Sequence, residues 1–204
     1  MADARFWDRL ADRYARRPID DPAAYEATLE RVRAHLTPQD RALEIGCGTG
    51  STAILLAPAV AAYHATDISP RMIEIARGKP EAQALPHLSF AVAEGVPEEG
   101  APWDAILAFN TLHLLDDLPT ALAQVHARLR PGGRLISKTP CLGDLSIFIR
   151  LLVPAMRLVG LAPPVKFVTA AGLETAISTA GFRIVETGDY PAKRAQRLIV
   201  AERA

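Results

Sequence analysis

The segment LEIGCGTG at residues 43–50 sets three alternating glycines directly after a short apolar run. Residues 42–45 predict a buried strand, and the glycines predict a sharp loop that leads into a helix. Glycine lets the chain bend tightly and lets a ligand approach the bare backbone. The spacing is G-x-G-x-G and differs from the G-x-G-x-x-G of dinucleotide-binding proteins. Glu44 on the strand would also repel a pyrophosphate, so the loop favours a ligand with a positive amino group.

Strands and helices alternate along the chain on the C-terminal side of this loop. We expect further strands at residues 61–66, 88–93, 103–109 and 134–138, and helices at 51–58, 70–79 and 116–130. Strands separated by helices predict parallel pairing with right-handed crossovers, hence a doubly wound α/β sheet with helices on both faces. Strands at 182–187 and 196–202 follow each other without a helix between them. This succession predicts a terminal antiparallel pair at the sheet edge.

Length and composition favour a single domain over residues 1–204, with no repeat or linker. Half of the residues are hydrophobic and 23% are charged, as in folded globular proteins. Apolar residues at helical spacing predict two helices, at 3–16 and 22–36, in an N-terminal helical cap of residues 1–38. Residues 141–168 predict an apolar, lid-like insertion before a helix at 170–180.

Charge and cysteine content exclude several classes of partner and compartment. The chain has 23 Lys and Arg and 23 Asp and Glu, and a net charge of zero argues against nucleic-acid binding. Cys47 and Cys141 are too few for a disulfide framework and indicate a reducing cytoplasm. The charged N-terminus lacks the apolar core of a signal peptide. The most apolar stretch, residues 145–161, contains a proline and two arginines, so we expect no transmembrane segment.

Polar side chains stand at the ends of the next three strands. Asp67 follows residues 61–66, Glu94 and Gly95 follow the third strand, and Asn110 follows the fourth. Open α/β sheets bind their ligands at the carboxyl ends of strands, where the topology switches. A carboxylate at Asp67 can accept hydrogen bonds from both hydroxyls of a ribose. Glu94 is placed to meet an adenine amino group.

Five ordered segments resemble the class I S-adenosylmethionine-dependent methyltransferases. They are LEIGCGTG at 43–50, TDISPRMIEIAR at 66–77, FAVAEG at 90–95, WDAILAFNTLHLLDD at 103–117 and LRPGGRLI at 129–136. The resemblance covers about residues 40–140 and implies a Rossmann-like, mostly parallel seven-stranded sheet with an antiparallel last strand. It also implies S-adenosylmethionine as cofactor and methyl transfer to a small-molecule acceptor.

The resemblance assigns roles to individual residues. The methionine end of the cofactor falls to Glu44, the glycine loop and Asn110, the ribose to Asp67, and the adenine to Ile68, Met72, Glu94 and Gly95. Glu94 departs from the family pattern, in which Asp is commoner. Tyr14 lies in FWDRLADRY, which looks like the segment that many small-molecule members fold over the cofactor. The expected cofactor-binding residues are Tyr14, Glu44, Gly46, Cys47, Gly48, Thr49, Gly50, Asp67, Ile68, Met72, Glu94, Gly95 and Asn110.

No residue is obliged to be catalytic, because the methyl group of this cofactor is already activated. His113 lies near the expected transfer site and is a candidate general base. Asp116 and Asp117 follow it at a spacing that could hold a metal, but they are better explained as helix caps, so we expect no metal. A lipid or protein methyltransferase, or a cofactor-binding module without catalysis, remains an alternative.

The apolar residues 145–160 have two interpretations. A helix that is apolar almost all round must be buried, dimerised or placed against something apolar. It either packs on the sheet or forms a homodimer contact, or it belongs to a substrate lid that accepts a small hydrophobic acceptor.

Overall fold

The computed structural model describes residues 4–146, 152, 165–190 and 195–204. Its strands are β1 (Arg41–Ile45), β2 (Ala62–Asp67), β3 (Leu88–Val92), β4 (Trp103–Phe109), β5 (Leu129–Pro140), β6 (Phe182–Asp189) and β7 (Gln196–Arg203). They form one seven-stranded sheet in the order β3-β2-β1-β4-β5-β7-β6. The expected helix at 145–160 lies, apart from residues 145, 146 and 152, outside the described residues.

The sheet confirms the predicted doubly wound topology. β1 pairs in parallel with β2 on one side and β4 on the other, so the chain reverses its direction of winding at the centre of the sheet. β3 and β5 extend the parallel part outward. β7 runs antiparallel to both β5 and β6. The terminal antiparallel pair therefore lies at the sheet edge as expected, with β6 outermost and the last strand inside it.

The described helices are α1 (Ala4–Ala15), α2 (Pro22–Arg33), α3 (Ser51–Leu56), α4 (Pro70–Gly78), α5 (Pro80–Gln83), α6 (Leu118–Arg128) and α8 (Ala170–Thr179). A polar side chain begins each of four of them by accepting a hydrogen bond from the backbone N–H three residues on, which replaces a missing helical bond. These caps are Asp21, Ser69, Asp117 and Thr169. Asp117 thus caps a helix, as expected from its place in the sequence.

Most boundaries lie within a few residues of those expected, and the main differences concern β5 and α5. β5 begins at Leu129 rather than at Arg134, because Leu129 already pairs with Trp103 before the register shifts at the glycines. The short helix α5 was not expected, since its four residues are too few to show a helical period.

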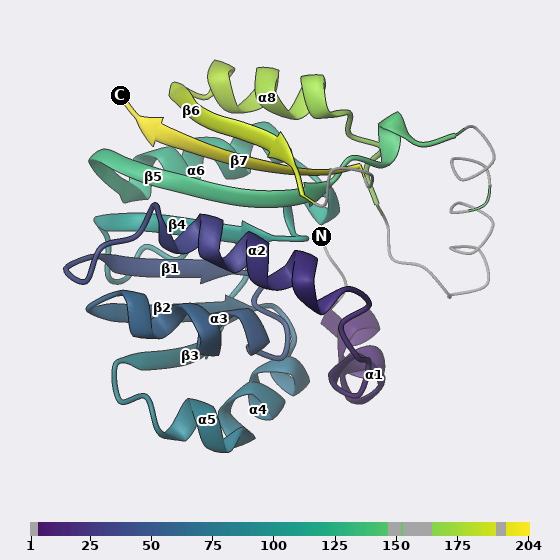
Figure 1. Ribbon diagram of the computed structural model, residues 1–204, viewed down its shortest axis with the longest axis vertical. Coiled ribbons are helices and arrows are strands. Elements are labelled where there is room, and N and C mark those ends of the chain that lie inside the picture. The colour runs from purple at the N-terminus through teal and green to yellow at the C-terminus, as the bar shows by residue number, and fades with distance from the viewer. Residues whose placement is uncertain (1–3, 147–151, 153–164, 191–194) are drawn as a thin grey trace.

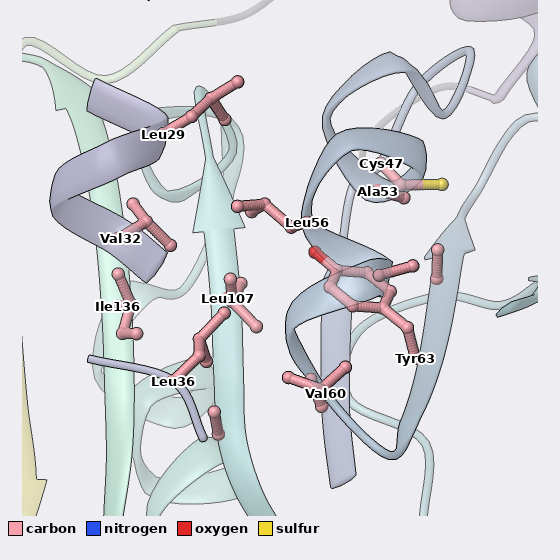
Figure 2. Close-up of a cluster of buried hydrophobic side chains, with 14 of the residues drawn as sticks. Leu29, Val32, Leu36, Cys47, Ala53, Leu56, Val60, Tyr63, Leu107 and Ile136 are labelled. Atoms are coloured by element: carbon pink, nitrogen blue, oxygen red, sulfur yellow. The ribbon is translucent and has the colours of Figure 1, made fainter. Parts of the chain in front are cut away.

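Helices cover both faces of the sheet and bury two separate apolar clusters (Figure 1). α2, α3, α4 and α5 pack on one face, over Tyr63, Leu107 and Ile136. Figure 2 shows side chains from α2, α3 and the central strands meeting in this cluster. α6 and α8 cover the other face, over Leu43 and Ile106. The strands are apolar on both faces because both are covered.

The two N-terminal helices occupy different places. α2 packs on the sheet through Leu29 and Val32 and belongs to the helical layer. α1 lies past the end of the sheet at which β1, β2 and β4 finish (Figure 1). Of the two helices expected in the N-terminal cap, only α1 lies beside the carboxyl ends of the strands. Within the described residues, no helix is long and apolar enough to cross a membrane.

We expect Leu107→Ala to lower the free energy of unfolding by about 2–5 kcal/mol, because Leu107 is fully buried on the central strand β4 and its loss leaves a cavity. Leu55→Ala is the control, since Leu55 is 41% exposed and should change the stability by about 0.5 kcal/mol or less. Urea unfolding of both variants checks this. Equal losses would contradict the assignment of the core.

Candidate active site

A cavity of about 750 Å³ opens at the carboxyl ends of β1, β2, β3 and β4, a size that suits a small-molecule ligand. It brings together most of the residues singled out in the sequence. They are Tyr14, Gly46, Gly48, Asp67, Ile68, Met72, Glu94, Gly95, Asn110 and His113. Glu44, Cys47, Thr49 and Gly50 were also expected to contact a ligand, but they do not line the cavity.

The glycine loop turns Gly46 and Gly48 toward the cavity, both with a positive φ that glycine adopts without strain. A Cβ on Gly46 would lie 2.4 Å from Oγ1 of Thr111, so only glycine fits against this neighbour. A Cβ on Gly48 would meet only the ring of Tyr14, at 3.8 Å. The absent side chain of Gly48 therefore leaves room for a ligand.

The intervening loop residues pack inward. Cys47 and Thr49 are buried, and Cys47 belongs to the cluster beneath α3. Burial raises the pKa of the Cys47 thiol well above its usual value, so the thiol stays neutral. Gly50 has no room for a Cβ, which would lie 2.7 Å from the ring of Phe90. Cys47, Thr49 and Gly50 therefore pack the loop against the protein interior and do not face the cavity.

Glu44 lies beneath the loop and is only 1% exposed. The hydroxyl of Tyr63 donates a hydrogen bond of 2.8 Å to its Oε2. Burial raises the pKa of Glu44 from 4.5 to about 7, the bond from Tyr63 opposes this rise, and the charge of Asp67 adds to it. Glu44 is therefore a buried, hydrogen-bonded acid of the strand.

Asp67 joins two loops and lines the cavity. Its Oδ2 accepts the N–H of Gly48 at 2.8 Å, and its Oδ1 accepts the N–H of Ser69 at 2.9 Å. Burial raises the pKa of this carboxyl, while the two N–H groups oppose the rise. Each oxygen keeps a further lone pair, so the carboxylate can accept two hydroxyls from a ligand.

The first two turns of α6 form a wall of the cavity that sequence reasoning missed. Thr120 and Gln124 lie one turn apart on this helix and line the cavity together with Glu94 and Gly95. A Cβ on Gly95 would lie 3.6 Å from Oε1 of Gln124. The spacing of Thr120 and Gln124, just after a helix cap at the carboxyl edge of the sheet, is the signal that could have revealed them.

The chain leaves β4 through a strained turn. Asn110 has φ 54°, an uncommon value for a residue other than glycine, and its N–H donates to the carbonyl of Lys138 at 2.7 Å. The turn leads to a short 3-10 helix, Leu112–Leu114, that contains His113.

His113 lines the cavity but is only 8% exposed. Among the described residues its Nδ1 has no hydrogen-bond partner. Burial lowers the pKa of His113 to about 4, so the imidazole is neutral near pH 7. An imidazole with such a pKa is a weak base, which weighs against strong general-base catalysis.

The remaining walls come from α1 and from the acids of the rim. Trp7 and Tyr14 of α1 both line the cavity. The charged residues among the described lining are all acidic: Asp67, Glu94, Asp116 and Asp117. In the part of the chain that the structure describes, no group of three or more His, Cys, Asp or Glu side chains could hold a metal ion.

The raised pKa of Glu44 predicts a pH dependence of stability. Between pH 4.5 and 7 the folded protein holds a proton on Glu44 that the unfolded chain releases, so this group destabilises the fold as the pH rises through that window. From pH 5 to 7.5, wild type should therefore lose up to about 3 kcal/mol relative to Glu44→Gln, whose amide can still accept from Tyr63. Denaturant unfolding at both pH values measures the difference. Parallel pH profiles would refute the shift.

Comparison with known proteins identifies the family. A sequence-family profile described as a methyltransferase domain matches residues 8–187. The O-methyltransferase cnsE of Penicillium expansum is 32% identical over 191 residues, which cover 83% of this chain but only 65% of that protein.

Solved structures share the fold along nearly the whole chain. The N-methyltransferase NodS of Bradyrhizobium japonicum, in complex with S-adenosyl-l-homocysteine, superposes with a TM-score of 0.72 at 19% identity, covering 97% of this chain and 98% of NodS. A Thermotoga maritima protein described as a possible histamine N-methyltransferase gives 0.72 at 24% identity, covering 99% and 100%. Because the profile spans most of its length, this chain belongs to the methyltransferase domain family.

Proposed function

We propose that this protein transfers the methyl group of S-adenosylmethionine to a small hydrophobic acceptor. The observation that carries the proposal is Asp67, whose carboxylate lines the cavity beside the open backbone of Gly48. Family membership supports the reaction class. The cnsE relative is named an O-methyltransferase, and the NodS structure contains the demethylated cofactor.

The residues present fit this cofactor. The space left by the missing side chain of Gly48 accepts the methionine portion, with Asn110 beside it. Asp67 accepts the ribose hydroxyls, and Ile68 and Met72 pack against the adenine. The acidic lining suits a cofactor with a positive sulfonium and a positive amino group.

Glu94 and Gly95 read the edge of the adenine in this proposal. Both line the cavity, and Gln124 lies beside Gly95, where its amide is available to the same end of the ligand. The longer side chain of Glu94, in place of the commoner Asp, reaches the adenine amino group from an exposed position.

When bound, S-adenosylmethionine supplies a methyl group already activated by the sulfonium. The protein then has to align the acceptor and exclude water, for which Trp7 and Tyr14 of α1 provide aromatic cover. Neutral His113 offers a hydrogen bond to the acceptor from the buried wall.

The methyl acceptor is proposed to be small and hydrophobic because of two features. Apolar side chains form part of the cavity lining, including Phe109, Leu114 and Pro140. Residues 145–160 are also strongly apolar in sequence. Whether those residues cover the acceptor or form a homodimer contact stays a prediction, because they lie almost entirely outside the described residues.

The test is to incubate the protein with S-adenosylmethionine and a panel of small aromatic, quinone-like and aliphatic acceptors, and to measure S-adenosylhomocysteine. Formation of S-adenosylhomocysteine that depends on the presence of one acceptor supports the proposal. Transfer of labelled methyl only to the protein or lipid fraction of a cell extract would favour the protein or lipid alternative. Tight cofactor binding with no transfer to any fraction would favour a binding module.

We also propose a reducing, cytoplasmic location. Cys47 and Cys141 are both free and buried, as expected of a chain that does not rely on disulfides.

Asp67→Ala should raise the Kd for S-adenosylhomocysteine at least about tenfold, because two charge-assisted hydrogen bonds to the ribose are lost, each contributing about 1.5–3 kcal/mol. Calorimetry measures the Kd. Asp12→Ala is the control, since the Asp12 carboxylate is exposed and does not line the cavity. Unchanged affinity in a folded Asp67→Ala protein would remove the ribose assignment.

His113→Gln should lower kcat less than about tenfold, whereas loss of a general base costs about 10²–10⁴. The acceptor KM should rise because a hydrogen bond is lost, and wild-type kcat should show no rise through pH 6–7, since the pKa of His113 is about 4. His87→Gln, outside the cavity, is the control. A hundredfold loss of kcat, with a wild-type rise through pH 6–7, would instead make His113 the base.

A further inference from the structure

Helix α1 is fastened to the start of α4 by one carboxylate. Oδ1 of Asp8 accepts the hydroxyl of Ser69 at 2.5 Å and the N–H of Arg71 at 3.1 Å. Ser69 is the fully buried cap of α4, and its Oγ accepts the N–H of Met72 at 3.1 Å. Asp8 thereby adds a second, charged acceptor at a helix N-terminus, where negative charge is stabilising.

The same serine connects α1 to the proposed ribose site. The N–H of Ser69 donates to Oδ1 of Asp67, and Oδ2 of Asp67 holds the N–H of Gly48. Hydrogen bonds therefore run without a break from Asp8 through Ser69 and Asp67 to the glycine loop. Shielding from water strengthens such bonds, and Ser69 and Asp67 are both buried.

A second contact fastens α1 one turn later. Arg71 on α4 pairs with Asp12 at 2.7 Å and with Glu74 at 2.7 Å. Both of its partners are exposed, and exposed ion pairs contribute little to stability. Asp8 is thus the stronger of the two attachments.

The face of α1 that turns toward the ligand carries Trp7 and Tyr14, two turns apart, and both line the cavity. Trp7 directly precedes Asp8 in the chain, so the position of the aromatic cover follows the position of the Asp8 carboxylate.

We propose that Asp8 is a positioning residue that couples the docking of α1 to cofactor binding. Release of the Asp8 contact frees α1 from α4 and withdraws Trp7 and Tyr14 from the cavity. It also removes one of the hydrogen bonds that hold Ser69, the residue whose N–H donates to Asp67. Bound cofactor, by the reciprocity of linkage, holds α1 in its docked place. This inference rests on the proposed function, because it takes the ligand to be S-adenosylmethionine.

The experiment follows limited trypsin cleavage of the folded protein, because α1 carries Arg5, Arg9 and Arg13 on its exposed surface. Cleavage there reports how often the helix undocks. Cleavage rates are measured with and without S-adenosylhomocysteine, alongside the calorimetric Kd. The variants are Asp8→Ala, Asp8→Asn and the matched control Asp12→Ala, and circular dichroism checks that each is folded.

In wild type, S-adenosylhomocysteine should slow cleavage in α1 about tenfold. Asp8→Ala should be cleaved about tenfold faster than wild type without ligand, and its Kd should rise about tenfold. Asp8→Asn keeps an oxygen that can accept from Ser69 and Arg71, so it should recover most of both effects. Asp12→Ala should stay within about threefold of wild type in both measurements.

Two outcomes overturn the inference. One is an Asp8→Ala protein with wild-type Kd and wild-type cleavage. The other is a wild-type protein that binds S-adenosylhomocysteine without any slowing of cleavage in α1, a measurement that stands even if Asp8→Ala does not fold. Failure of wild type to bind S-adenosylhomocysteine at all would instead overturn the proposed function.

Discussion

The site depends on the two hydrogen bonds that Asp67 accepts from backbone N–H groups. One comes from Gly48 in the loop after β1 and the other from Ser69 in the turn before α4. Because the strands β1 and β2 are neighbours in the sheet, their loops leave it side by side, and a single carboxylate can tie both. Each carboxylate oxygen of Asp67 uses one lone pair for these bonds and keeps another for a ligand. A change at Asp67 therefore alters the shape of the loop as well as its charge.

Close packing constrains two of the three glycines in the loop. Gly46 meets Thr111 in the turn after β4, and Gly50 meets Phe90 of β3, so a side chain at either position would collide with a neighbouring side chain. Gly48 alone of the three has free space beside it. Three glycines that look equivalent in the sequence are thus required for two different reasons. Gly46 and Gly50 allow close packing at the strand ends, and Gly48 leaves space in the cavity.

The order of the elements and most of the cavity could be predicted from the sequence, because strand ends in a doubly wound sheet converge on one edge. Asp67, Glu94 and Asn110 reached the cavity for that reason. Glu44 was expected to contact a ligand but is buried within the sheet layer instead. Because side chains alternate along a strand, Glu44 points away from the face of Leu43 and Ile45 and toward Tyr63 on the other face. The spacing of Thr120 and Gln124 after a helix cap could have revealed the wall that α6 forms. The contribution of Asp8 depends on how α1 docks on α4, which no local pattern contains.

Glu44 and Asp67 show how one edge of the sheet keeps two carboxyl groups with different protonation. Both are buried, and burial disfavours the charge of each. Asp67 receives two backbone N–H groups, which stabilise its ionised form, whereas Glu44 receives one phenol and also experiences the charge of Asp67. The pKa of Glu44 consequently rises to about 7, and the pair needs only one full negative charge near neutral pH. That charge belongs to the carboxylate that lines the cavity. Exchanging the two environments would bury the charge beneath the loop and leave a neutral acid facing the cavity. The two backbone donors to Asp67 therefore determine that the negative charge lies at the cavity wall.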